Sequence, residues 1–99
     1  MPSYQRWVDW LDEAEDNLAT VIDLLRLGRY SKACYFTQQA AEKALKALLI
    51  RRLNRYEHMH SVRELLEMLR DNGIDVDDEL IRVGDELDSY YVPTRYPSA

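Results

Sequence analysis

The chain has 99 residues, of which 46% are hydrophobic and 31% charged, and its formal net charge is −5. This length fits one domain with a small core, so residues 1–99 are treated as a single domain, and the composition excludes a disordered or fibrous protein. Because no apolar run approaches about 18 residues and no charged-then-apolar leader is present, we expect a cytoplasmic protein with no membrane span.

The first expected helix runs from Tyr4 to Leu27. Apolar residues recur along it at helical spacing, and Gly28 is a natural terminator. Only Gly28 and Arg29 separate it from the next helical pattern. The two helices should therefore form an antiparallel hairpin.

The second expected helix, Tyr30 to Ile50, contains no Gly or Pro. One side of it is apolar or small, and half of that side is Ala or Cys: Tyr30, Ala33, Cys34, Thr37, Ala40, Ala41, Ala44, Leu45, Leu48 and Leu49. Such a helix can lie close to its neighbours, which favours the middle of a bundle. The other side carries Gln38, Gln39, Glu42, Lys43 and Lys46, and its simplest interpretation is a solvated face with local charge pairs.

A polar segment, Arg51 to His60, follows this helix. Ser61 and Glu64 then form a capping-box pattern, which predicts a third helix that ends before Gly73. Acidic residues from Asp75 to Glu79 favour the start of a fourth helix. The sequence thus predicts an all-α fold, an antiparallel up-and-down bundle of four helices.

Charge is distributed unevenly along the chain. From Glu42 to Arg63 there are six lysines or arginines and two acids, whereas from Glu64 to Asp88 there are ten acids and two arginines. This pattern predicts one basic pole. The alternative is that the two segments neutralise each other within the fold or across a dimer.

Four segments, in order, resemble HEPN domains. Tyr30 to Leu49, with the run Gln39 to Ala47 at its centre, is similar to the second helix of that family. The Trp-rich first helix, the pair His60-Ser61 and the segment Tyr90 to Pro97 agree with it, the last being similar to the family's Arg-Tyr-Pro signature. The resemblance implies a HEPN-like bundle associated with nucleotide or RNA. It also implies a toxin–antitoxin pair in which the partner is a minimal nucleotidyltransferase.

The resemblance also bears on assembly. HEPN domains usually continue beyond the Arg-Tyr-Pro signature into another helix, while this sequence stops at Ala99. A shorter bundle would expose apolar surface on the first and fourth helices, so we predict a homodimer that buries it.

Catalytic residues are sought in a motif of RNA-cutting HEPN toxins, an Arg followed after four to six residues by His. Arg55 and His60 have this spacing, and the resemblance implies His as general acid or base and Arg as the partner of the phosphate charge. The motif is loosely defined in a chain with ten arginines, and in the toxins it lies later in the domain. The alternative is an inert loop histidine.

Candidate ligand-binding residues lie on the second helix and near the carboxyl end. They are Lys43, Lys46, Tyr91, Arg95 and Tyr96, in which cations would contact phosphate and rings would stack on a base. Alternatively, Tyr91 and Tyr96 pack on the first helix and Arg95 pairs with a carboxylate such as Glu42. We expect no metal and no cofactor, because His58 and His60 supply at most two ligands and no glycine-rich phosphate loop exists.

The resemblance implies two functions, and the residue patterns add a third. The first is a nucleotide- or RNA-associated HEPN protein that acts with a minimal nucleotidyltransferase. The second is a metal-independent endoribonuclease toxin. The third is a non-catalytic dimerisation or adaptor module, which the acidic net charge favours.

Overall fold

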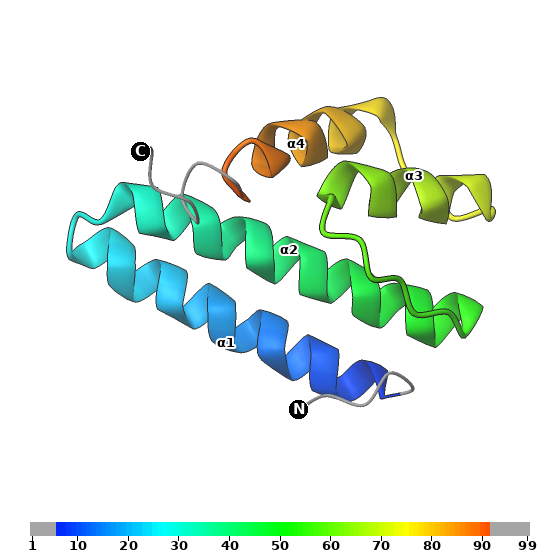
Figure 1. Cartoon of the computed structure of the whole chain (residues 1–99), viewed down its shortest axis with the longest axis horizontal. Helices are drawn as coiled ribbons and strands as arrows, with labels where there is room; N and C mark the ends of the chain where they lie inside the picture. The colour runs from blue at the N-terminus through cyan, green and yellow to red at the C-terminus, as the bar shows by residue number, and fades with distance from the viewer. Residues whose placement is uncertain (1–5, 92–99) are drawn as a thin grey trace.

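The computed structural model describes residues 6–91, which form four helices and no strand (Figure 1). These are α1 (Trp7–Arg26), α2 (Tyr30–Leu53), α3 (Val62–Asp71) and α4 (Asp78–Asp88). The predicted all-α bundle is confirmed. The first helix begins three residues later than expected, and the second continues three residues beyond Ile50.

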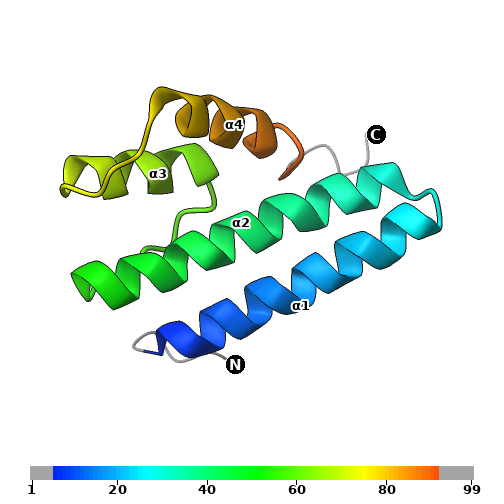
Figure 2. The same cartoon turned by 180° about the vertical axis from the view of Figure 1, so that it is seen from behind.

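The helices α1 and α2 form the expected antiparallel hairpin (Figures 1 and 2). Gly28 turns the chain with a φ of +72°, a conformation that glycine adopts without a steric penalty. Small buried residues on both helices let the backbones approach closely, namely Ala14 on α1 and Ala33, Ala40 and Ala47 on α2. Among the described helices, α1 contacts only α2.

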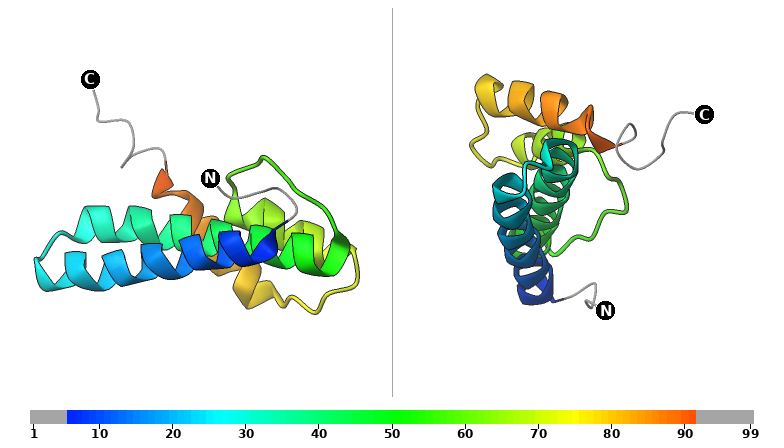
Figure 3. Two further views of the ribbon diagram at one scale, coloured as in Figure 1. Left: turned by 90° about the horizontal axis from the view of Figure 1, so that it is seen from below. Right: turned by 90° about the vertical axis from the view of Figure 1, so that its left-hand side faces the viewer.

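The helices α3 and α4 pack as a second pair, on the other side of α2 from α1 (Figure 3). Their crossing is close at Gly84, where an added Cβ would lie 2.9 Å from Leu66 Cδ1 and 3.2 Å from the backbone nitrogen of Arg63. A glycine at this point of α4 therefore permits the two helices to touch.

The main hydrophobic core lies between the carboxyl half of α2 and the α3–α4 pair. Its buried members are Leu49, Val62, Leu65, Leu66, Leu69 and Val76. Because α2 contacts each of the other three helices, its predicted central position is confirmed.

The polar side of α2 differs from the expectation. Gln38, Glu42 and Lys46 are buried, with 0%, 3% and 3% of their surface exposed. The interpretation of a solvated face is wrong for these three residues. The reason is that the chain between α2 and α3 runs back along α2, over this side of the helix, as Figure 1 shows.

Apolar side chains remain exposed on the two helices where this was expected. They are Val8, Leu18, Ile22 and Leu25 on α1, and Leu80 and Val83 on α4. None of the described helices combines the length and the apolar character that crossing a membrane requires.

Candidate functional site

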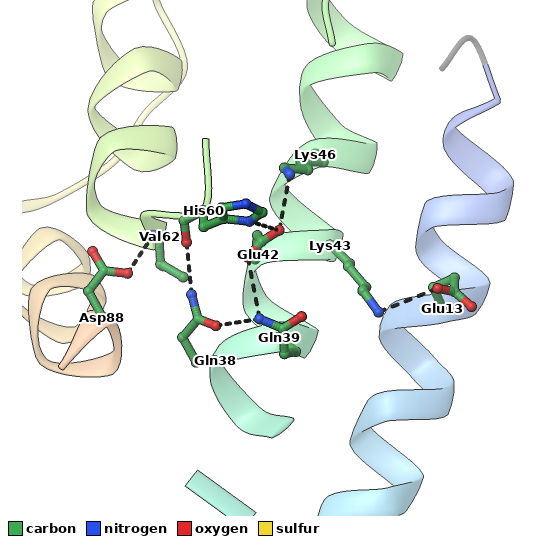
Figure 4. A network of polar contacts seen from close by, with 9 residues as sticks. All are labelled: Glu13, Gln38, Gln39, Glu42, Lys43, Lys46, His60, Val62 and Asp88. Carbon is green, nitrogen blue, oxygen red and sulfur yellow. Dashed lines mark hydrogen bonds and ion pairs between the residues drawn. The ribbon is translucent and has the colours of Figure 1, made fainter. Parts of the chain in front are cut away.

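A buried carboxylate, that of Glu42, is the centre of a polar network on α2 (Figure 4). Its Oε2 lies 3.0 Å from Nζ of Lys46 and 3.3 Å from Nδ1 of His60. The amide nitrogen of Gln39 lies 3.5 Å from its Oε1. A carboxylate removed from water needs such partners, and here they come from its own helix and from the linker 54–61, which connects α2 to α3.

The linker is also held through its backbone. Gln38 Nε2 donates a hydrogen bond of 2.8 Å to the carbonyl oxygen of His60, and Gln38 Oε1 accepts one of 2.8 Å from Gln39. Gln38 is completely buried, so this bond fixes the linker at a point shielded from water. Both the main chain and the ring of His60 are therefore positioned by α2.

The two candidate lysines are engaged in ion pairs. Lys46 pairs with Glu42 and lies 5.6 Å from the ring centres of both Trp10 and Tyr56, which encloses its ammonium group. Lys43 Nζ lies 3.4 Å from Glu13 on α1. Lys46 thus does not line an open groove, and a ligand would reach Lys43 only in competition with Glu13.

His60 itself is accessible, since 56% of its side chain is exposed. Its ring stacks on that of Tyr91, with centres 5.2 Å apart and an interplanar angle of 15°. Together with Ser61 and Asp88, the two rings line a hollow of about 190 Å³, which we call the His60 hollow. Residues from three elements thus meet around one half-exposed imidazole.

The amino end of α3 forms one wall of this hollow. Ser61 caps α3 as predicted, because its Oγ accepts a hydrogen bond of 3.1 Å from the backbone nitrogen of Glu64. Asp88 of α4 accepts further bonds there, from Ser61 Oγ at 2.6 Å and from the backbone nitrogen of Val62 at 2.7 Å. Asp88 was not singled out from the sequence, because the residues that it contacts lie 26 and 27 positions away.

The structure places Arg55 apart from His60. Arg55 Nε lies 3.1 Å from Glu57, and its side chain lines a different hollow, against α3. The other lining residues there are Met59, Glu64, Glu67, Met68, Asp71 and Asn72. The pairing of Arg55 with His60 in catalysis stays a prediction, and within the described residues nothing brings the two side chains into one hollow.

The carboxyl-terminal candidates are only partly visible. Tyr91 contacts His60 and lies 6.3 Å from Tyr35 of α2, measured between ring centres. Arg95 and Tyr96 lie outside the described residues, so their predicted roles stay predictions.

The arrangement around His60 suits proton transfer or anion recognition. Since Glu42 holds Nδ1, the opposite nitrogen, Nε2, is the one left for a ligand, and it makes no hydrogen bond within residues 6–91. An imidazole oriented by a carboxylate acts elsewhere as a general base or acid, or donates to an anionic oxygen. Within the same residues, no three His, Cys, Asp or Glu side chains gather as metal ligands.

A second surface feature is an apolar groove between α1 and α2. Two hollows of about 360 and 280 Å³ form it, and they share Leu11 and Ala44. The other lining residues are Trp7, Ala14, Glu15, Leu18, Thr37, Ala40, Ala41, Ala47, Leu48 and Arg51. We call this surface the α1–α2 groove.

Comparison with known proteins gives a family. The model of the HEPN domain matches residues 7–99. The chain is also similar to the crystal structure of TT1696 from Thermus thermophilus, with a TM-score of 0.86 and 43% sequence identity over 94% of this chain and 72% of that one. No curated protein matches the chain significantly. Because the family model covers nearly the whole sequence, the chain belongs to the HEPN domain family, whose members are generally related to nucleotides or RNA.

Proposed function

We propose that this chain is a nucleotide- or RNA-associated HEPN protein that binds its ligand at the His60 hollow. The observation that carries the proposal is the half-exposed His60 ring, fixed by the buried Glu42 and stacked on Tyr91. Preorganised rings bind bases because stacking requires little further ordering of the protein.

The chemistry of the hollow fits a nucleotide in two ways. The paired rings of His60 and Tyr91 offer a flat surface of the kind on which bases stack. The Nε2 of His60 accepts a hydrogen bond from a ribose hydroxyl when the ring is neutral, and it donates one to a phosphate oxygen when the ring is protonated. Asp88 lies at the same hollow and accepts bonds from the start of α3, so it disfavours a phosphate directly at that helix end and directs an anion towards His60.

Binding is tested by titrating the protein with AMP, GMP, CMP and UMP while amide resonances are recorded by NMR. We expect shifts that centre on His60, Ser61 and Tyr91. The variant His60→Ala should lose at least about tenfold in affinity, the loss of one stacked ring. Tyr30→Ala is the matched control, since it removes an exposed ring that does not line the hollow. Equal affinities for wild type and His60→Ala would refute the assignment.

A second candidate function is RNA cleavage. The observation in its favour is the Glu42–His60 contact, which holds the imidazole as enzymes hold a general base. Incubation of the purified protein with a mixed-sequence RNA should then yield fragments, and His60→Ala should yield none. Cleavage by His60→Ala at the wild-type rate would exclude this role, and binding without cleavage would leave the first proposal in place.

For the partner, we propose a minimal nucleotidyltransferase in a toxin–antitoxin pair. Family membership supports it. Expression of this chain alone should arrest growth, and co-expression of a nucleotidyltransferase encoded beside it should relieve the arrest. Absence of arrest, together with absence of nucleotide binding, would favour the adaptor function.

We also propose a homodimer, formed through the α1–α2 groove. Alanines line much of the groove, and their small side chains leave room for a helix to pack closely against it. Leu18, which is 52% exposed, lies within the groove. We place the contact at the end of the groove that holds Glu15 and Leu18, so that Trp7 and Arg51 at its other end stay outside it.

Light scattering tests the dimer. The wild-type mass should be twice that of the 11.7 kDa chain, and Leu18→Asp should give the single mass. The matched control is Leu27→Asp, because Leu27 is 71% exposed but lies outside the groove. A monomeric wild type at micromolar concentration would refute the homodimer.

A further inference from the structure

We infer that the carboxyl end of α2 carries a second contact surface, for single-stranded nucleic acid, that leads towards the His60 hollow. This inference rests on the proposed association with nucleotide or RNA, and it adds the region where a strand would bind. The residues that form it, called here the strand-binding surface, are Trp7, Arg51, Arg52, Tyr56 and His58.

The first step is charge. Most lysines and arginines in the described part of the chain are in ion pairs with acids. Arg51 and Arg52 are exposed on the last turn of α2, and within residues 6–91 neither pairs with an acid. Arg55 follows, after Asn54 turns the chain with a φ of 51°, but it pairs with Glu57. Two guanidinium groups are thus left for phosphate, on a protein whose net charge is −5.

The second step is the aromatic residues around the end of α2 and the start of the linker. The guanidinium of Arg51 lies 5.5 Å from the ring centre of Trp7 on α1. Tyr56 stacks on Trp10 at 5.5 Å, and the ring of His58 meets Tyr56 edge-on at 4.7 Å. Cations that alternate with rings are the arrangement by which proteins hold single strands, since phosphates pair with arginine and bases stack on the rings.

The third step is direction. The linker 54–61 is not helical and runs from the end of α2 back along that helix, as Figure 1 shows. It carries Tyr56, His58 and His60 at every second position; the rings of Tyr56 and His58 are in contact, and His60 lines the His60 hollow. A strand whose phosphates contact Arg51 and Arg52 would therefore have a line of rings towards His60.

The hairpin turn provides a natural comparison. Arg26, Arg29 and Lys32 are also exposed there, and within residues 6–91 none of them is in an ion pair. Among the described residues, however, no cation lies over a ring at that end. If charge alone governed binding, the two ends would behave alike, so substitutions at the turn separate a built surface from general attraction.

The experiment compares two double variants, R51E/R52E and R26E/R29E. Each replaces two arginines with two glutamates and changes the net charge from −5 to −9, which is −5 minus 4. Binding of a fluorescein-labelled twelve-nucleotide oligo(U) is measured by anisotropy at several salt concentrations. Oligo(dT) and poly-glutamate serve as competitors, and circular dichroism confirms that both variants fold.

We expect R51E/R52E to bind oligo(U) at least about tenfold more weakly, and the slope of log affinity against log salt to fall by about 1.4, the share of two phosphate contacts on a single strand. R26E/R29E should bind within about threefold of wild type, a loss of the size that net charge alone produces. Oligo(dT) should displace oligo(U) if the protein contacts only phosphates and bases, and it should fail to displace oligo(U) if the 2′-hydroxyl contributes to binding. Either result is consistent with a single-stranded ligand.

Equal losses in the two variants, equal competition by poly-glutamate, or absence of oligo(U) binding by wild type at about 50 mM salt would each overturn the inference. Nucleotide binding is measured in parallel with UMP. If His60→Ala loses UMP while R51E/R52E keeps oligo(U), the strand-binding surface is wrong and the proposed function stands. If none of AMP, GMP, CMP and UMP binds wild type, the proposed function itself fails.

Discussion

Glu42→Gln tests whether the buried network on α2 holds the fold together. The substitution preserves shape and a hydrogen-bond acceptor for His60, but it leaves the ammonium of Lys46 without its carboxylate at 3.0 Å. Both side chains are nearly inaccessible, at 3% and 5% exposure, so water cannot replace the lost partner.

The expected magnitude follows from that burial. Removing one member of a buried ion pair costs about 3–5 kcal/mol, and the rings of Trp10 and Tyr56 beside Lys46 return about 1 kcal/mol of this to the cation. We expect the free energy of unfolding to fall by about 2–4 kcal/mol, out of roughly 5–15 for a domain. With a urea m-value of about 1.5 kcal/mol per M, the unfolding midpoint falls by about 1.3–2.7 M.

The double variant Glu42→Gln/Lys46→Met is the control, because it also removes the Lys46 ammonium that Glu42→Gln leaves without a carboxylate partner. It should recover most of the stability, since an apolar side chain of similar length replaces the ammonium. Equilibrium urea unfolding of the wild type, both single variants and the double variant completes the cycle. A loss below about 1 kcal/mol for Glu42→Gln, as in an exposed pair, or a double variant as unstable as Glu42→Gln, would refute the reasoning.

Substitutions at three further positions test how the helices are joined. Gly84→Ala should lower the free energy of unfolding by about 1–2 kcal/mol, because the added methyl group lies 2.9 Å from Leu66 and this crowding outweighs the better helix propensity of alanine. Thermal unfolding measures the change, and a stabilised variant would contradict the close crossing of α3 and α4. Asp88→Ala should lower the free energy of unfolding by about 1–2 kcal/mol, because α3 loses the hydrogen bonds from its start to Asp88. Hydrogen exchange of the Val62 amide should become faster, and an unchanged rate would contradict this role of Asp88. In urea unfolding, Asn54→Gly should be neutral or slightly stabilising, whereas Asn54→Val should destabilise the protein by about 1 kcal/mol. The φ of 51° at this position suits glycine and not a β-branched residue. The reverse order of stabilities would count against a left-handed conformation at the end of α2.

The fold was largely predictable from sequence, because its signals are local. Apolar spacing and Gly28 set the α1–α2 hairpin, and the Ser61 cap set the start of α3. The central place of α2 followed from its small residues. The exposed apolar residues on α1 and α4 were likewise expected.

The polar side of α2 was not predictable by the same reasoning. Helical spacing places Gln38, Glu42 and Lys46 on one face but does not say what covers that face. A linker without secondary structure covers it here, and such a segment has no periodic signal to reveal its path. The contact of Asp88 with α3 escaped prediction for a related reason, because it joins residues far apart in the chain.

The burial of Gln38, Glu42 and Lys46 changes how the likeness to other HEPN domains should be weighed. These side chains belong to the segment that resembles the second helix of HEPN domains, and their contacts hold the linker. Two chains that share this segment should therefore share the path of the linker backbone, whereas the exposed side chains of the linker are free to differ. Activity within the family should accordingly depend on the exposed side chains of the linker, such as His58 and His60, more closely than on overall sequence identity.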